Sequence, residues 1–338
     1  MARLRFTRGG ADDVRYGPCV TPSRSALGTE PRVGGDADLP GLPEELFVDE
    51  RHPAGGWRDG SGPVVVLVHG SLDRASSFRR VARRLDGLRV VTYDRRGYRS
   101  SRAAPVSDDL AVHVDDLVRV ATAYAGHPAG HDGVVAVGHS AGGTIVLGAA
   151  VERPDLFRAV GAYEPTMPWL GFHAESRPSQ ADNESGPSQA DAERRPSQAD
   201  AERRPSQADK EEDHDPGLGA ERFFRRVVGG RAWERLSEGQ RAELRADGAA
   251  LLADLRAVRR DVPFDVTALA VPTIVASGGP SSFPHHLDTA DWLAAHVATV
   301  RRSTIACAGH GAHLSHPDAF AAFVRDVAAM GARARDTD

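Results

Sequence analysis

The chain has 338 residues, of which 41% are hydrophobic and 26% are charged, enough apolar material for one large α/β domain with an accessory segment. Its net charge is −5, from 42 lysine and arginine residues against 47 acidic ones, and no basic stripe is interleaved with aromatic residues, so nucleic acid is not an expected partner. The apolar runs are too short for a signal peptide or a membrane span, so we expect a cytoplasmic protein without a membrane partner.

The N-terminal part of the chain is not expected to belong to the folded core. Residues 1–43 are rich in glycine, proline, arginine and aspartate and show no hydrophobic periodicity, which predicts a disordered arm. The first strand-like run is a short one, at 45–48. Two cysteines, Cys19 and Cys307, lie far apart in the sequence, and we expect no disulfide between them.

The next segments have the pattern of a parallel sheet. Residues 64–68 are apolar without alternation, as in a strand buried on both faces, and they lead into His69-Gly70-Ser71. A second short strand is expected at 89–93, followed by Asp94-Arg95-Arg96-Gly97. Apolar residues at helical spacing then predict a helix over 110–124. Strand, strand and helix in this order are typical of an α/β domain.

The most informative segment is a serine-bearing turn between a strand and a helix. An apolar β-branched run at 134–137 enters Gly138-His139-Ser140-Ala141-Gly142, and small residues compatible with a helix follow at 144–151. The two glycines leave room for a sharp turn that exposes Ser140 at its apex. A serine hydroxyl is a weak nucleophile unless a base and hydrogen-bond donors converge on it. The rest of the chain would therefore have to supply those groups.

A histidine follows the last strand-like run, as the base of such a site requires. Residues 300–305 form that run, and Gly309-His310 comes shortly after it, before a helix that starts near Pro317 and runs to about 330. His310, His313 and His316 together could suggest a metal site, but no clear carboxylate or cysteine completes one. We therefore predict neither a metal nor a cofactor.

These motifs resemble the α/β-hydrolase superfamily of serine hydrolases over roughly residues 44–330. The resemblance implies an α/β-hydrolase fold, with a mostly parallel sheet, helices on both faces and a helical cap. It implies that Ser140 is the nucleophile and His310 the base, and that the backbone N–H groups of Ser71 and Ala141 form the oxyanion hole. His69, by the same resemblance, shapes the oxyanion loop and does no chemistry.

The acid that orients the histidine is the ambiguous member of the set. Most of the superfamily carries it after the strand expected here at 273–277, yet no carboxylate follows that strand until Asp288. The strand expected at 159–163 ends in Glu164-Pro165, and some members carry their acid at that position. We predict that Glu164 is the acid and keep Asp288 as the alternative, although the helical pattern after Asp288 favours a role as N-cap.

A tandem repeat interrupts the region between these two strands. Pro-Ser-Gln-Ala-Asp recurs at 178, 187, 196 and 205 with almost no large apolar side chain, which predicts a disordered insertion over about 174–216. The insertion lies within an expected cap region, 166–262, that separates a first core part, 44–165, from a second, 263–332. Helical apolar faces after about residue 219 would build the cap.

Taken together, the sequence predicts a serine hydrolase that cleaves a small or medium-sized, largely apolar ester or related acyl compound through an acyl-enzyme. A cap that encloses an apolar pocket favours such a small-molecule substrate over a polymer or a highly charged compound. The serine at the turn argues against the dehalogenase and epoxide-hydrolase branches, which by the resemblance carry aspartate there. Two alternatives stay open: a hydrolase-like ligand-binding protein with little turnover, and a cofactor-free lyase or haloperoxidase-like enzyme of the same fold.

Overall fold

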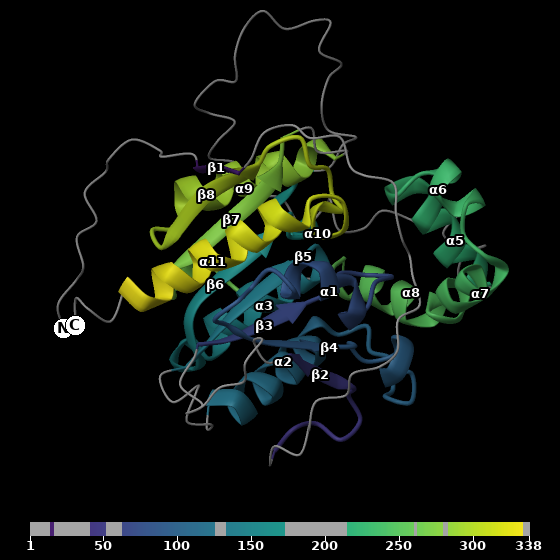
Figure 1. The fold of residues 1–338 in the computed structure, drawn as a ribbon, viewed down its shortest axis with the longest axis horizontal. Coiled ribbons are helices and arrows are strands. Elements are labelled where there is room, and N and C mark those ends of the chain that lie inside the picture. The colour runs from purple at the N-terminus through teal and green to yellow at the C-terminus, as the bar shows by residue number, and fades with distance from the viewer. Residues whose placement is uncertain are drawn as a thin grey trace, which may run out of the picture.

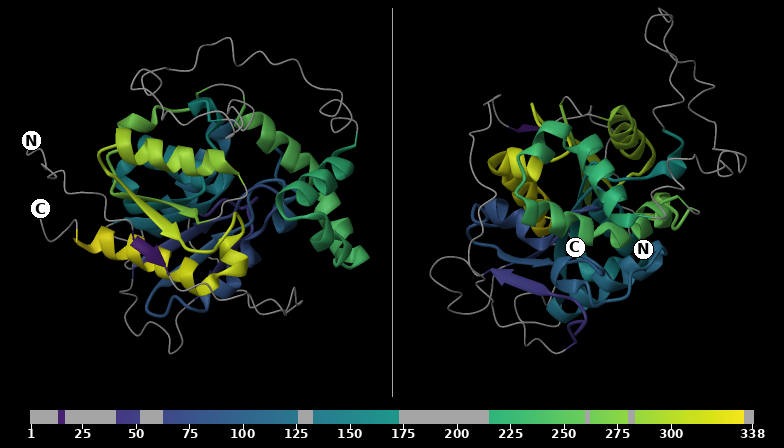
Figure 2. Two further views of the ribbon diagram at one scale, coloured as in Figure 1. Left: turned by 90° about the horizontal axis from the view of Figure 1, so that it is seen from above. Right: turned by 90° about the vertical axis from the view of Figure 1, so that its right-hand side faces the viewer.

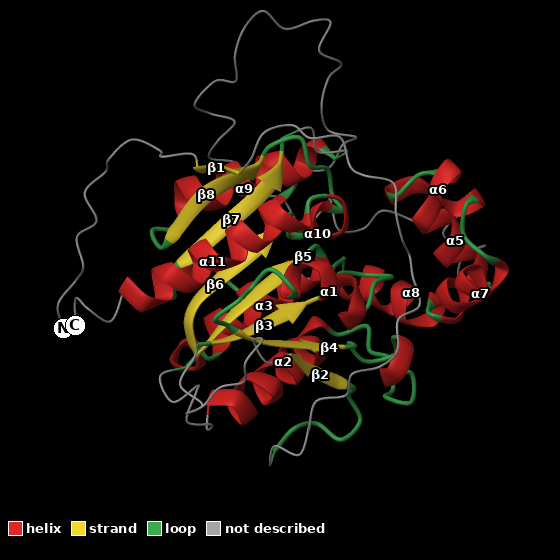
Figure 3. Cartoon of the chain, viewed as in Figure 1, coloured by secondary structure: helices red, strands yellow, loops and turns green. Residues whose placement is uncertain are grey.

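The computed structural model describes residues 14–16, 41–51, 63–125, 133–172, 215–259, 262–279 and 283–333. The arm predicted at 1–43 and the insertion predicted at 174–216 therefore lie almost wholly outside the described residues. Figure 1 shows the described chain as a central sheet flanked by helices, with a separate group of helices, α5 to α8, at one side. The strands are coloured yellow and the helices red in Figure 3.

The described strands form one eight-stranded sheet in the order β1-β8-β7-β6-β5-β3-β4-β2. β2 runs antiparallel to β4, and every other neighbouring pair is parallel. In a parallel sheet the carboxyl ends of the strands share one edge, which is where loops can bring side chains from distant segments together. The strands are β1 (Val14–Tyr16), β2 (Val48–Arg51), β3 (Val64–Val68), β4 (Arg89–Tyr93), β5 (Val134–His139), β6 (Phe157–Tyr163), β7 (Thr273–Gly278) and β8 (Val300–Ile305).

Helices cover both faces of the sheet because its strands are apolar on both sides. On β3, Val64, Val66 and Val68 join one core cluster, and Val65 and Leu67 join the other. The first cluster includes residues of α2 (Leu110–Ala125), α3 (Ala141–Glu152) and α9 (Pro284–His296), and the second includes residues of α1 (Arg79–Ala82) and α11 (Pro317–Arg333). The predicted α/β-hydrolase architecture, a mostly parallel sheet with helices on both faces, is confirmed.

The cap helices have a small core of their own. They are α5 (Pro216–Val227), α6 (Gly230–Glu234), α7 (Glu238–Ala246) and α8 (Gly248–Ala257). Trp233, Leu236, Leu244 and Leu251 are buried together in this core, and Leu72, from the loop after β3, packs with them. The left view of Figure 2 shows these helices grouped at one side of the main sheet. The cap is thus anchored on the loop that precedes α1.

Several local predictions differ from the structure. The strand expected at 45–48 begins at Val48 instead, and β1, in the predicted arm, was not expected at all. α5 begins at Pro216, inside the range assigned to the insertion, because Asp215 caps it by accepting the Leu218 N–H at 3.0 Å. Asp288 is not an N-cap, since α9 already begins at Pro284. No helix among the described residues has the length and apolar character needed to cross a membrane.

Candidate active site

Ser140 occupies a strained turn between β5 and α3. Its backbone adopts φ 55° and ψ −126°, a conformation that costs energy for any residue with a side chain. A Cβ on Gly138 would collide with the carbonyl of Gly142, and one on Gly142 would collide with the carbonyl of Val68. Glycine at both positions therefore lets β5, α3 and β3 approach closely enough to form the turn, as the sequence predicted.

The Ser140 hydroxyl faces the imidazole of His310. Its Oγ lies 3.1 Å from Nε2 of His310 and 3.3 Å from the hydroxyl of Thr166. His310 lies in the loop between β8 and α10 (Ala312–Ser315). Two hydrogen bonds fix the backbone of this loop: Tyr163 donates its hydroxyl to Gly309 O at 2.7 Å, and His139 Nε2 donates to His310 O at 2.9 Å. The histidine is therefore held against the serine by side chains from β5 and β6.

Glu164 binds the other side of the same imidazole. Its Oε2 lies 2.7 Å from His310 Nδ1, and its Oε1 accepts the Gly278 N–H at 2.9 Å. The residue is fully buried at the end of β6, where a positive φ of 45° turns the chain out of the sheet. Since a carboxylate can only accept, Nδ1 of His310 carries the proton, and Nε2 is left as the acceptor for the Ser140 hydroxyl.

The alternative acid does not have access to the histidine. Both ring nitrogens of His310 already have partners, Glu164 at Nδ1 and Ser140 at Nε2. Asp288 lies within α9, past its first turn. Of the two carboxylates considered from the sequence, Glu164 is the one that the structure brings together with Ser140 and His310.

The two expected oxyanion donors lie beside Ser140. Ala141 is the first residue of α3, so its N–H has no partner within the helix. Ser71 follows Gly70, on which a Cβ would come within 2.9 Å of the Ser140 Cβ, so the oxyanion loop and the serine turn are in contact. Neither N–H takes part in a hydrogen bond within the described part of the chain.

His69 orients the peptide that carries the Ser71 N–H. The backbone N–H of Arg95 donates to His69 Nε2 at 2.9 Å, so the ring proton is on Nδ1, which donates to Gly70 O at 2.8 Å. The carbonyl and the N–H of one peptide point in opposite directions, so this bond sets the direction of the Ser71 N–H. Burial and the nearby Arg95 charge lower the pKa of His69, which keeps it neutral in this role.

Sequence reasoning missed one residue that contacts the imidazole. The ring of His286, on α9, stacks on that of His310 with centres 4.8 Å apart and planes 7° from parallel. His286 is buried and also hydrogen-bonds the backbone of Pro165. Burial, followed by the proximity of His310, lowers its pKa well below the usual range. Its sequence neighbourhood, Pro284-His285-His286, carries no motif that would have identified it.

Two groups of described side chains have the composition of a metal site. Asp73, His139 and His313 form one, and Glu164, His286 and His310 form the other; within each group the possible ligand atoms lie within 4.8 Å of one another. Asp73 is the carboxylate that sequence reasoning did not find near His313, and it accepts from His313 Nε2 at 3.1 Å. In the second group, Glu164 and His310 are already hydrogen-bonded to each other.

A cysteine lies close to His310 in the sequence. Cys307, three residues before His310, is disulfide-bonded, so the expectation that it would not be is wrong. The other cysteine of the chain, Cys19, lies outside the described residues.

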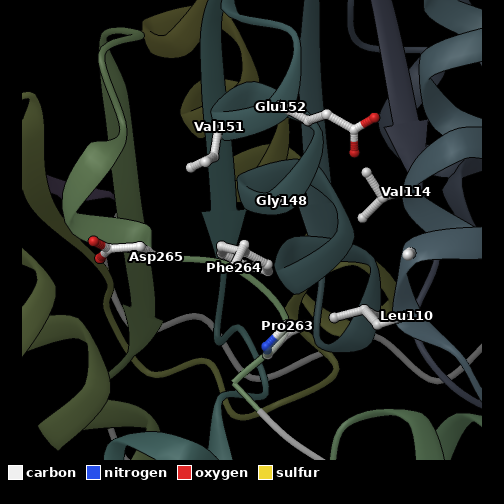
Figure 4. Close-up of a pocket in the computed structure, with 9 residues that line it drawn as sticks. Leu110, Val114, Gly148, Val151, Glu152, Pro263, Phe264 and Asp265 are labelled. Carbon is white, nitrogen blue, oxygen red and sulfur yellow. The ribbon is translucent and has the colours of Figure 1, made fainter.

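A cavity of about 310 Å³ lies away from Ser140, between α2, α3 and the segment that enters from the cap. Figure 4 shows its lining, which is mostly apolar, with the carboxylates of Glu152 and Asp265 at its margins. Gly148 lies eight residues after Ser140 on α3, about 12 Å along a helix, and Ser140, His310 and Glu164 do not line the cavity. It is therefore separate from the serine site.

Relatives of the chain are found among curated proteins. It is 34% identical over 111 residues to the uncharacterized hydrolase YraK of Bacillus subtilis, a match that covers 32% of this chain and 39% of YraK. A match to an epoxide hydrolase of Caballeronia sordidicola has 37% identity over 105 residues and covers 30% of each protein. A third match, to the polyketide synthase ThaQ of Burkholderia thailandensis, has 30% identity over 275 residues and covers 78% of this chain but 12% of ThaQ. The chain thus spans less than half the length of each of these relatives.

Solved structures resemble the fold at low sequence identity. The enol-lactonase from Burkholderia xenovorans superposes with a TM-score of 0.57 at 18% identity, covering 84% of this chain and 96% of the enzyme. An esterase from Thermogutta terrifontis gives 0.53 at 19% identity, covering 85% and 93%. Residues 65–323 match the Alpha/beta hydrolase family. Because this match runs from β3 into α11 and takes in every element that carries Ser140, Glu164 and His310, the chain belongs to the alpha/beta hydrolase family.

Proposed function

We propose that the protein is a serine hydrolase that cleaves a small or medium-sized, largely apolar ester or related acyl compound. One observation carries the proposal: a continuous chain of hydrogen bonds runs from the buried Glu164 carboxylate through His310 to the hydroxyl of Ser140. His310 faces the Glu164 carboxylate with Nδ1 and the Ser140 hydroxyl with Nε2, which is the orientation that acyl transfer needs. Membership of the hydrolase family supports the same activity class.

In this mechanism Ser140 Oγ attacks the acyl carbonyl while His310 Nε2 takes the hydroxyl proton. The backbone N–H groups of Ser71 and Ala141 stabilise the negative oxygen of the tetrahedral intermediate. Glu164 stabilises the imidazolium that forms, and His310 then gives the proton to the leaving group. Water, activated by the same imidazole, hydrolyses the acyl-enzyme. No step requires a cofactor.

The cap supports an apolar substrate of limited size. Its core packs on Leu72, directly after the proposed oxyanion residue Ser71, so the cap borders the space in which the acyl group would lie. We propose that the cap limits this space and so favours a small neutral compound over a polymer. We further propose that the protein acts without a nucleic-acid or membrane partner.

The match to an epoxide hydrolase covers 30% of each protein, and the serine at the apex of the turn favours an acyl-enzyme over the aspartate chemistry that the resemblance assigns to that branch. The cytoplasmic location stays a prediction. The disulfide at Cys307 argues against it, because disulfides are more typical of an oxidising compartment. Cell fractionation with a tagged chain tests it.

The proposed function is tested by labelling with a fluorophosphonate probe, followed by a panel of p-nitrophenyl esters of increasing acyl length. We expect the probe to modify the protein at Ser140 and to leave Ser140→Ala unlabelled, and short acyl esters to be hydrolysed. Loss of Ser140 should lower kcat by about five to six orders of magnitude, as for other serine nucleophiles. Labelling that survives in the variant, or labelling without hydrolysis of any ester, would favour the binding-protein alternative.

A further inference from the structure

A buried carboxylate of the cap is hydrogen-bonded to the loop that carries the proposed oxyanion donor. Asp254, on α8, is 2% exposed. Its Oδ2 accepts from Ser71 Oγ at 2.8 Å and from Tyr98 Oη at 2.7 Å. Arg95 donates to both oxygens, from Nη1 to Oδ2 at 2.9 Å and from Nη2 to Oδ1 at 2.6 Å. All of these donors come from the main domain, and the acceptor comes from the cap.

The contacts of Asp254 brace two consecutive residues of the oxyanion loop. Ser71 is held directly through its hydroxyl, and the N–H of Leu72 donates at 3.3 Å to the same Tyr98 hydroxyl that donates to Asp254. Leu72 has a positive φ of 54°, a conformation that a non-glycine residue keeps only when its surroundings impose it. Its side chain is also buried in the cap core. The cap therefore contributes to the local geometry of Ser71 on both the polar and the apolar side.

The charge of Asp254 is compensated where it lies. Burial disfavours the ionised form, but the Arg95 guanidinium outweighs this effect and lowers the pKa of the carboxyl to about 2. A buried carboxylate with a two-point arginine partner is a fixed acceptor, because its geometry is set by the planar fork of the guanidinium. The Ser71 hydroxyl is thus tied to a rigid point and not to a mobile surface group.

We propose that Asp254 is a positioning residue for the oxyanion hole, acting through the Ser71 hydroxyl to hold the Ser71 N–H at the angle that the tetrahedral intermediate needs. The proposal rests on the serine-hydrolase function proposed above. It makes the docking of α8 on the main domain part of the support of the oxyanion hole, since the acceptor lies on that helix. A displaced N–H donor loses much of its stabilising effect, so a small shift in Ser71 is costly for catalysis.

The chain offers a matched control on the same helix. Asp247, at the start of α8, is also fully buried and anchors the cap to the main domain, where it accepts from the Arg99 N–H at 3.2 Å and from Arg102 Nε at 2.9 Å. Its hydrogen bonds in the described structure go to the segment after β4 and not to Ser71 or Leu72. Asp247→Asn therefore weakens the attachment of the cap without touching the proposed tether.

The experiment compares Ser71→Ala, Tyr98→Phe, Asp254→Asn and Asp247→Asn by ester hydrolysis, by affinity for a trifluoromethyl ketone and by thermal unfolding. The ketone forms a tetrahedral adduct with Ser140 and so reports on the oxyanion hole. We expect Ser71→Ala and Tyr98→Phe to lower kcat about tenfold, and to weaken ketone affinity by the same factor, with KM within twofold of the wild type. Asp254→Asn should lower kcat about a hundredfold. Asp247→Asn should keep kcat and ketone affinity within twofold while lowering Tm.

The results separate this inference from the proposed function. An active wild type in which Ser71→Ala changes only KM or Tm would overturn the positioning role and leave the hydrolase function intact. Equal effects of Asp247→Asn and Asp254→Asn on kcat would overturn it as well, because general loosening of the cap would then suffice. Should Asp254→Asn fail to fold, Ser71→Ala and Tyr98→Phe decide, since each removes one hydroxyl. A wild type that neither labels nor hydrolyses would overturn both proposals.

Discussion

The ends of β6 and β7 are neighbours in the sheet, yet they contribute different groups to the same histidine. β6 is followed directly by Glu164, whose carboxylate is fully buried and binds His310 Nδ1. β7 ends in Gly278, which brings no side chain and donates its backbone N–H to the other oxygen of Glu164. The chain beyond β7 returns through α9 and stacks His286 on the His310 ring.

The difference shows that the segments after β6 and β7 support His310 in different ways. A negative charge comes from β6, and β7 supplies a hydrogen-bond donor for that charge together with a neutral ring that fixes the plane of His310. A second carboxylate at the end of β7 would lie beside Glu164, and two buried like charges raise one another's pKa. The absence of an acid directly after β7 is therefore what a charged Glu164 requires.

Removing the negative charge of Glu164 should have the largest effect on catalysis. Glu164→Gln should lower kcat by about 10⁴, because an amide can hold the wrong tautomer of His310 and cannot stabilise the imidazolium. Asp288→Asn, the matched change after β7, should stay within twofold of the wild type. Steady-state hydrolysis of one p-nitrophenyl ester measures both. The reverse pattern would assign the acid to Asp288.

The sequence predicted the parts of this arrangement that are local. Ser140 and His310 each belong to a short motif whose geometry is set by neighbouring residues. Glu164 was predicted as the acid because no carboxylate directly follows β7. The pairing of Asp254 with Arg95 spans 159 positions, and the stacking of His286 on His310 depends on where α9 docks. Contacts of that kind depend on tertiary packing and leave no periodic or motif signal in the chain.

Removing the ring on the β7 side should have a smaller effect. His286→Ala should lower kcat about tenfold, since loss of the stacked ring lets the His310 plane rotate away from the Ser140 hydroxyl. His286→Phe keeps an apolar ring in the same place and should recover most of the rate. Kinetic assays of the two variants test this role. Equal losses in both would mean that the His286 nitrogens, and not its ring, support His310.

The neutral histidines around the site should make stability depend on pH. Burial lowers the pKa of His139 and His286 in the folded protein, so below about pH 6.5 the unfolded chain binds more protons and the free energy of unfolding falls. Each contributes about 1.4 kcal/mol per pH unit. A second fall is expected between about pH 4 and pH 2, because the pKa of Asp254 is lowered to about 2.

Urea unfolding between pH 8 and pH 4 measures the first fall. His286→Gln does not titrate and should reduce the slope below pH 6.5 by roughly one proton. A wild type equally stable at pH 8 and pH 5 would contradict the buried neutral state of these histidines.

The central claim is that Glu164 accepts the Nδ1 proton of His310, and proton NMR in water tests it most directly. A hydrogen bond of this kind should give an imidazole N–H resonance well downfield of the backbone amides. We predict that this resonance is present in the wild type and in Asp288→Asn and is lost in Glu164→Gln. A resonance that persists in Glu164→Gln and disappears in Asp288→Asn would contradict the account.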